Sequence, residues 1–116
     1  GIGLHRYDVL HRASWMDDVA DIEVPAVHQD QIVLCPPSAR VTLASKFTPY
    51  AGLDYGDAIS FQFHPEFTTS FGIALLEAKR DRFGALTDPA IASFGRADDC
   101  ARVASWIGRF LDSTQN

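Results

Sequence analysis

The sequence is poor in sulfur and has no concentrated run of positive charge. Its 116 residues include two cysteines and one methionine, and 10 basic against 15 acidic side chains give a formal net charge of -5. Two cysteines are too few for a disulfide scaffold, so Cys35 and Cys100 are expected to be reduced thiols. Without a basic run, neither nucleic acid nor an anionic membrane is expected as the main partner. No apolar run approaches the roughly 20 residues of a membrane span and no charged-then-apolar leader precedes the first strand, which favours a cytoplasmic protein.

The pattern of apolar residues predicts strands followed by helices. With 47% hydrophobic residues, the chain is expected to form one globular unit. The expected elements are strands over 2–9, 23–28 and 40–45, a connection or hairpin over 46–57, a strand ending at 64, helices over 71–83 and 98–111, a short exposed helix or loop over 11–21, and a loop over 85–96. This order fits an α/β sheet with helices on its faces.

The strand that ends at His64 carries the most informative pattern and is expected to be the central one. Ile59, Phe61 and Phe63 fall on one face, while Ser60, Gln62 and His64 fall on the other. Pro65 cannot donate a ladder hydrogen bond, so the strand is expected to stop there. If extended geometry continues through Glu66, its carboxylate lies on the same side as the imidazole and accepts a hydrogen bond from one ring nitrogen.

A histidine held in this way can act as a base through its other nitrogen. An imidazole oriented by a buried carboxylate is two parts of the device that activates a serine or cysteine nucleophile. The simpler interpretation is a histidine that ends a strand and a glutamate that caps the next helix, and three residues alone favour it. However, Phe63-His64-Pro65-Glu66 followed by Phe67-Thr68-Thr69 resembles the signature of class I, triad-type glutamine amidotransferases. The resemblance implies that His64 and Glu66 complete a Cys-His-Glu triad.

A second polar segment follows the strand expected over residues 23–28. His28 and Asp30 lie two residues apart, but no second pair at ligand spacing accompanies them, so a polar turn is favoured over a metal site. The segment also resembles the loop beside the glutamine pocket of the same family. That resemblance implies that His28, Gln29 and Asp30 are substrate-binding residues.

The resemblance further implies a three-layer α/β fold with flanking helices, flavodoxin-like, of which residues 1–116 look like the carboxyl-terminal portion. The family carries its nucleophile in a Gly-x-Cys-x-Gly elbow, which this sequence lacks. Cys35 precedes two prolines, which offer no N–H donors, and Cys100 follows two aspartates, whose charge opposes a thiolate. Both cysteines are therefore interpreted as structural. The nucleophile-bearing amino-terminal portion is expected to be absent, and this chain alone to be inactive.

For the full-length protein, the resemblance implies hydrolysis of glutamine to glutamate and ammonia through a cysteinyl thioester. No metal or organic cofactor is needed for that half-reaction. Ammonia would pass to an unknown acceptor, so a synthetase subunit or acceptor enzyme is the implied partner, and an exposed sheet edge would favour a homo-oligomer. Two alternatives stay open: a γ-glutamyl hydrolase of the same fold, and a non-catalytic regulatory or interaction module derived from it.

Overall fold

Five antiparallel strands form one sheet in the computed structural model, which describes residues 2–27 and 37–114. The strands are β1 (Ile2–Val9), β2 (Asp21–Val27), β3 (Arg40–Ala44), β4 (Gly52–Asp54) and β5 (Ile59–Phe61). They pair in the order β2-β1-β3-β4-β5. β1 pairs with β2 along most of its length and with β3 only near its end, at Asp8 and Val9. The expected strands are thus present, and residues 46–57 form a hairpin whose returning strand is β4.

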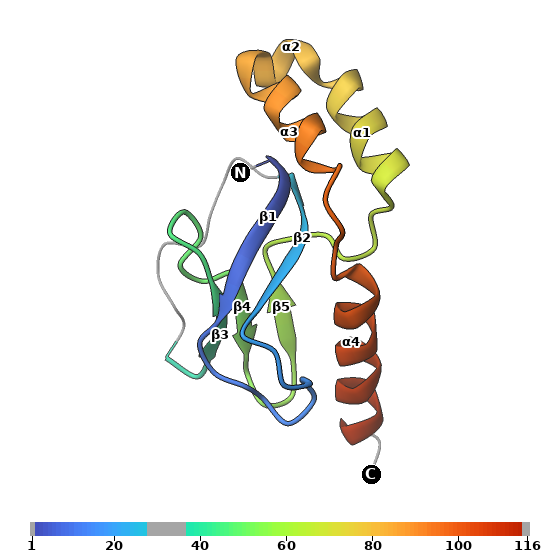
Figure 1. Ribbon diagram of the computed structural model, residues 1–116. Coiled ribbons are helices and arrows are strands. Elements are labelled where there is room, and N and C mark those ends of the chain that lie inside the picture. Colours follow the sequence, from blue (N-terminus) through green and yellow to red (C-terminus); the bar gives the residue numbers. More distant parts are fainter. Residues whose placement is uncertain (1, 28–36, 115–116) are drawn as a thin grey trace.

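The helices follow the strands in the chain, and Figure 1 shows them in two groups. The helical elements are α1 (Thr69–Ala78), α2 (Arg80–Phe83), the short 3-10 turn η1 (Gly84–Leu86), α3 (Thr87–Ser93) and α4 (Cys100–Thr114). α1, α2 and α3 gather beyond one end of the sheet, whereas α4 lies alongside it. None of the helices in the described residues is long and apolar enough to cross a bilayer.

The sheet curls so that its two outer strands approach each other. β2 and β5 stand at opposite ends of the pairing order, yet the N–H of His64, just after β5, donates to the carbonyl oxygen of Pro25 in β2 at 2.7 Å. Inside the curl, the Tyr7 and Phe63 ring centroids lie 5.0 Å apart. Pro25 is tolerated in the middle of β2 because β2 is an edge strand, where a missing N–H breaks no ladder bond. The chain around His64 is therefore held by both ends of the sheet.

The main core lies between the curled sheet and α4. Val103, Trp106 and Phe110 of α4 are buried against Tyr7, Val24 and other sheet residues in one cluster. Each such side chain contributes roughly 1.5–3 kcal/mol when fully buried. The helix predicted over residues 98–111 is therefore confirmed, with Trp106 fully buried on its inner side and Leu111 51% exposed.

A smaller core joins α1 and α3 to the start of β1. Leu76, Ala90 and Phe94 form its centre, with Ile2 and Val27 packed against it. Gly72 of α1 permits this packing, because a Cβ atom there would come within 2.6 Å of the Phe94 ring. The pair α1–α3 is therefore anchored to the start of β1 and the end of β2, and β2 also holds the backbone of His64 through Pro25.

Two segments differ from the expectation in burial or type. Residues 11–20 form a loop, one of the two expected alternatives, but the loop is only partly exposed, since Ala13, Trp15 and Met16 are buried. Residues 85–96 are not a simple loop, because α3 runs through them. Its Thr87, Asp88 and Pro89 look like turn residues, but they occupy the first helical turn, where backbone N–H groups have no partner within the helix and proline is accepted.

The strand before His64 and the following helix also need correction. β5 is short and lies at the edge of the described sheet rather than at its centre. After Phe61, one more ladder-like bond joins Gln62 to Ala51, and the chain then bends towards β2. The helix predicted over residues 71–83 is interrupted at Lys79 and becomes α1 and α2. Thr68 caps α1 by accepting from the N–H of Phe71 at 3.1 Å, and Gly84 ends α2 with φ +53°.

Candidate functional site

His64 and Glu66 form the hydrogen bond that the sequence predicted, but they meet through a turn at Pro65 and Glu66 instead of the extended chain that was expected. Nδ1 of His64 lies 2.8 Å from Oε1 of Glu66. An ionised carboxylate has no proton to donate, so Nδ1 carries the hydrogen and donates it. In the neutral ring the proton-accepting nitrogen is then Nε2, and no hydrogen bond to Nε2 is made by any residue in ranges 2–27 and 37–114.

The backbone fixes where this pair stands. The N–H of His64 donates to Pro25, and the carbonyl oxygen of His64 accepts from the N–H of Phe67 at 3.2 Å. The second bond closes a tight turn over Pro65 and Glu66, which brings the two side chains to the same side. The pair is therefore built by a strand end, a proline and a turn, with β2 as its outside support.

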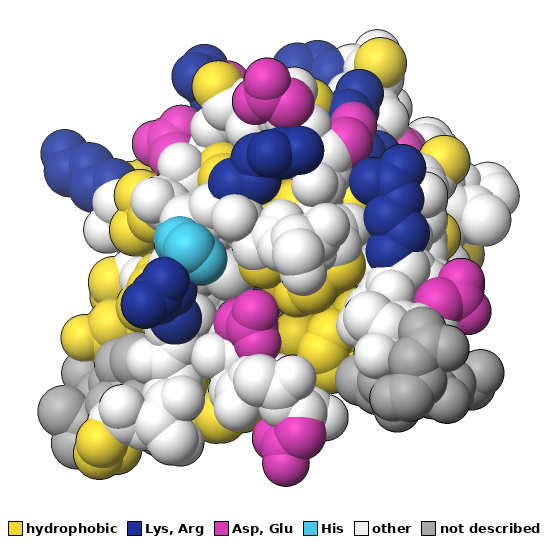
Figure 2. Space-filling view, turned by 90° about the horizontal axis from the view of Figure 1, so that it is seen from below, with side chains coloured by type: hydrophobic (Ala, Val, Ile, Leu, Met, Phe, Trp, Pro, Cys, Tyr) yellow, Lys and Arg dark blue, Asp and Glu magenta, His cyan; other side chains and the backbone are white. Residues whose placement is uncertain are grey.

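The pair stands at an open groove between β5 and α4. The groove has a volume of about 600 Å³ and is lined by Asp57–Phe61, Phe63–Glu66, Ile107, Phe110 and Leu111. Figure 2 shows hydrophobic side chains exposed in a hollow of the molecular surface, on the face seen from below. An apolar groove with an imidazole and a carboxylate on its wall has the composition of a small-molecule or peptide site.

The carboxylate is more exposed than the sequence led us to expect. Glu66 was predicted as a buried partner, but its side chain is 63% exposed, and that of His64 is 38% exposed. The reason is that Glu66 lies in a surface turn beyond the end of the edge strand. Solvent therefore screens the attraction between the two side chains in this chain.

An aromatic ring backs the imidazole, and the sequence analysis missed it. The rings of Phe67 and His64 are stacked, with centroids 4.4 Å apart and planes inclined by 7°. The Phe67 ring also meets Phe71 edge-on at 4.8 Å. An aromatic residue three positions after the histidine was the available signal, but the tight turn that brings the rings together was not predicted.

Cys100 lies close to the pair but is poorly suited to act as its nucleophile. Its Sγ donates to the carbonyl oxygen of Phe67 at 3.7 Å. Burial, followed by the side chain of Asp98, raises the pKa of the Cys100 thiol to about 12. The predicted opposition of the aspartates to a thiolate is confirmed, although burial is the larger cause. Cys35 lies outside the described residues.

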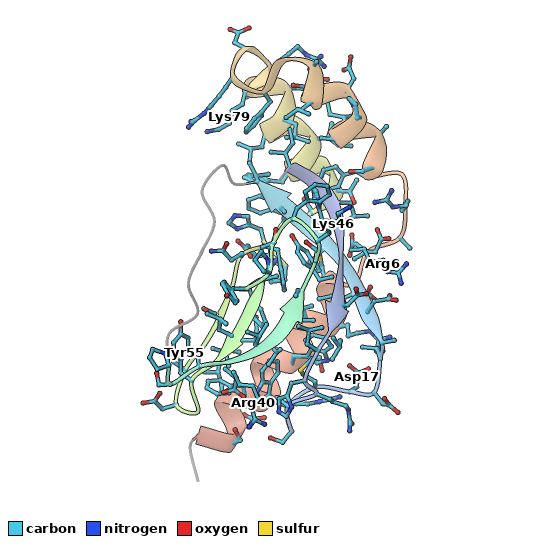
Figure 3. The ribbon with its side chains drawn as sticks, turned by 90° about the vertical axis from the view of Figure 1, so that its left-hand side faces the viewer. Arg6, Asp17, Arg40, Lys46, Tyr55 and Lys79 are labelled. Carbon is cyan, nitrogen blue, oxygen red and sulfur yellow. The ribbon has the colours of Figure 1, made fainter. Side chains whose placement is uncertain are left out.

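A second hydrogen-bonded carboxylate, also missed from sequence, lies on the other side of α4. Asp17 accepts from the indole N–H of the buried Trp106 and pairs with Arg102. The indole hydrogen bond and the Arg102 charge hold the pKa of Asp17 below its ordinary value of 3.8. In Figure 3, Asp17 lies near the Arg40 end of the molecule and far from Lys79 in the helical group. This cluster ties the 11–21 segment to α4.

The remaining predicted site residues are not placed by the structure. His28, Gln29 and Asp30 lie outside the described residues, so their relation to the groove stays a prediction. Within the described part of the chain, no three His, Cys, Asp or Glu side chains gather where they could hold a metal ion.

The fold is of the glutamine amidotransferase type. A glutamine amidotransferase from Thermotoga maritima (TM1158) superposes with a TM-score of 0.71 at 19% identity, over 97% of this chain and 50% of that one. The protein SMU.1228c superposes with a TM-score of 0.69 at 22% identity, over 99% of this chain and 52% of that one. The chain thus spans about half the length of both proteins. This confirms the predicted fold class, and at such identities it shows the fold alone.

No protein-family model matches the sequence. No curated protein matches it either.

Proposed function

We propose that this chain supplies the histidine and glutamate of a glutamine amidotransferase active site, where glutamine is hydrolysed to glutamate and ammonia. The observation that carries the proposal is the 2.8 Å bond between Nδ1 of His64 and Oε1 of Glu66 on the wall of an open groove. The amidotransferase-like fold supports it, because the pair then sits in a scaffold that a glutamine amidotransferase also uses. On the resemblance of their segment, His28, Gln29 and Asp30 are proposed as substrate-binding residues.

In the proposed reaction, a cysteine thiolate attacks the side-chain carbonyl carbon of glutamine. The C–N bond breaks, Nε2 of His64 gives a proton to the leaving ammonia, and a glutamyl thioester remains. His64 then takes a proton from water, which attacks the thioester and releases glutamate and the thiol. Glu66 keeps the proton on Nδ1 and stabilises the imidazolium. The half-reaction requires no metal or organic cofactor, and the ammonia passes to an acceptor on another domain or subunit.

The sulfur in this proposal comes from outside residues 1–116. Cys100 is buried with a raised pKa, and Cys35 is followed by two prolines. His64 lines the open groove, and in this proposal the thiol approaches Nε2 from that groove. A Gly-x-Cys-x-Gly elbow on the amino-terminal side of the same protein, or on a partner, would complete the site.

The test is a glutaminase assay of the full-length protein and its His64→Ala variant. We expect the variant to lose about three orders of magnitude or more in turnover, as removal of a triad base does elsewhere. His11→Ala is the matched control, because His11 is on the surface, is bonded to Arg40 and does not line the groove. Near-normal activity of His64→Ala would refute the assigned role.

The same assay separates the two alternatives. Hydrolysis of γ-glutamyl compounds in preference to glutamine would identify a γ-glutamyl hydrolase of the same fold. An elbow with serine, glycine or alanine in place of cysteine, together with no activity on either substrate, would identify a non-catalytic module.

A further inference from the structure

The bond between His64 and Glu66 is too exposed to orient the imidazole by itself. Exposed ion pairs contribute little, because long side chains lose entropy when they are held and water screens the charges. Glu66 is more exposed than His64 and has three rotatable side-chain bonds. A catalytic imidazole, by contrast, must keep its reactive nitrogen aimed at one point.

The ring of Phe67 supplies the constraint that Glu66 lacks. With centroids 4.4 Å apart and planes 7° from parallel, the imidazole cannot turn edge-on without losing the stack. The stack fixes only the plane, because a half-turn about the Cβ–Cγ bond leaves that plane unchanged while exchanging Nδ1 with a carbon. The hydrogen bond to Glu66 chooses between these two orientations. The two neighbours therefore fix different degrees of freedom.

Phe67 is held in place through its backbone. The N–H of Phe67 donates to the carbonyl oxygen of His64, and the carbonyl oxygen of Phe67 accepts from the thiol of Cys100 at the start of α4. Thr68, the next residue, caps α1. Phe67 is thus attached to α1 and α4 by contacts that involve neither the exposed Glu66 nor the ring of Phe71.

We propose that Phe67 is a positioning residue for His64: its ring fixes the plane of the imidazole, so that the bond to Glu66 leaves Nε2 aimed at the groove. The part of this inference that concerns turnover rests on the proposed function. The part that concerns the orientation of the ring stands on geometry alone.

The test compares Phe67→Leu with Phe71→Leu and Phe67→Tyr in the intact protein. Phe67→Leu removes the stacked ring, Phe71→Leu removes a ring of the same aromatic cluster that does not contact His64, and Phe67→Tyr keeps the stack. Long-range ¹H–¹⁵N spectra of the His64 ring report which nitrogen carries the proton. We expect mainly the Nδ1–H form in the wild type and in the Phe67→Tyr and Phe71→Leu variants, and a mixture of both forms in Phe67→Leu.

In a glutaminase assay, Phe67→Leu should lower kcat about two- to twelvefold, the range that corresponds to loss of one aromatic pair. KM should stay unchanged, because Phe67 does not line the groove. Phe67→Tyr should restore kcat. If Phe67→Leu does not fold, Phe67→Met removes the ring while keeping a flexible apolar side chain in its place.

The two proposals fail in distinguishable ways. An unchanged Nδ1–H signal in a folded Phe67→Leu or Phe67→Met protein would overturn the positioning role, whether or not the protein hydrolyses glutamine. A loss of the Nδ1–H form equally large in Phe71→Leu would also overturn it. Absence of glutaminase activity in the wild type, with the expected spectra, would overturn the proposed function and leave the positioning role supported.

Discussion

Two carboxylates of this protein accept a hydrogen bond from an aromatic ring, and they do so in opposite settings. Asp17 binds the indole of a fully buried Trp106, whereas Glu66 binds the imidazole of His64 on the wall of an open groove. An indole has one nitrogen, which can only donate, so after it donates to Asp17 the ring has no nitrogen that could accept a proton. A neutral imidazole that donates through one nitrogen still has a second nitrogen that can accept a proton. The same hydrogen bond therefore holds a structure together in one place and prepares a base in the other.

An ion pair with Arg102 also distinguishes the Asp17 site from the Glu66 site. Asp17 is also paired with Arg102, which in turn contacts Asp99 at the start of α4. Asp99 exchanges two bonds with the backbone of Glu23 in β2. Asp17 thus belongs to a chain of contacts that joins the loop, the helix and the sheet. The pair at the groove has no cation among the described residues that contact it.

The largest expected effect concerns Cys100, which the comparison of the Asp17 and Glu66 sites treats as structural and not as the nucleophile for His64. Because its pKa is raised from 9.0 to about 12, the thiolate at pH 8 should be scarce, and iodoacetamide should alkylate Cys100 about a hundredfold or more slowly than free cysteine. Mass spectrometry of a Cys35→Ser protein at timed intervals measures this rate. Rapid alkylation, or loss of activity in Cys100→Ser, would identify Cys100 as the nucleophile of the proposed reaction.

Of the residues around Asp17, Trp106 is expected to have the largest effect on the stability of the fold. Trp106→Ala removes a fully buried side chain that packs in the main core, and it should lower the free energy of unfolding by about 3–5 kcal/mol. Urea denaturation followed by circular dichroism measures the change. Trp106→Phe keeps most of the packing and should cost less. Equal effects of both variants would show that the indole N–H, and not the packing, dominates.

The carboxylate of Asp17 should contribute less than Trp106 to the free energy of unfolding, and only when it is ionised. Asp17→Asn should cost about 1 kcal/mol at pH 7, since a charge-assisted bond becomes a neutral one. Because the folded state holds the pKa of Asp17 below 3.8, this stabilisation is complete above that pH and is lost as the pH falls through the lower folded value. The difference in urea midpoint between wild type and Asp17→Asn should therefore shrink below about pH 3.8. A constant difference down to pH 2 would contradict it.

The smallest effect on stability is expected at the groove. Glu66→Gln should change the free energy of unfolding by less than about 0.5 kcal/mol, because the pair is exposed. Its glutaminase activity in the full-length protein should nevertheless fall at least about tenfold, because the tautomer and the imidazolium lose their partner. If Glu66→Gln lost as much stability as Asp17→Asn and kept its activity, both carboxylates would have a structural role and the distinction between them would be wrong.

Local chemistry was readable from the sequence. The alternation of residues 2–9 and 40–45 predicted β1 and β3, and the spacing of His64 and Glu66 across a proline predicted their hydrogen bond, although a turn and not an extended chain forms it. Each of these depends on side chains within a few residues of one another. Local patterns of this kind can be predicted without knowledge of the tertiary structure.

Features that depend on distant contacts were not readable. Trp15 and Met16 sit among acidic residues, which concealed their burial, and the Thr-Asp-Pro start of α3 resembles a turn until a helix is seen to follow. The edge position of β5 and its approach to β2 follow from the curl of the whole sheet. The stacking of Phe67 on His64 needs both the tight turn and the support of α1 and α4.

The bond from His64 to Pro25 has a consequence for how the molecule comes together. It links β2 to the segment after β5, so forming it costs the closure entropy of the long loop between them. Hairpins and helix turns join neighbouring residues and carry a much smaller cost of this kind. The position of the imidazole therefore depends on a long-range contact as well as on the turn next to it, and a change that opens the curl of the sheet would displace the base without touching it.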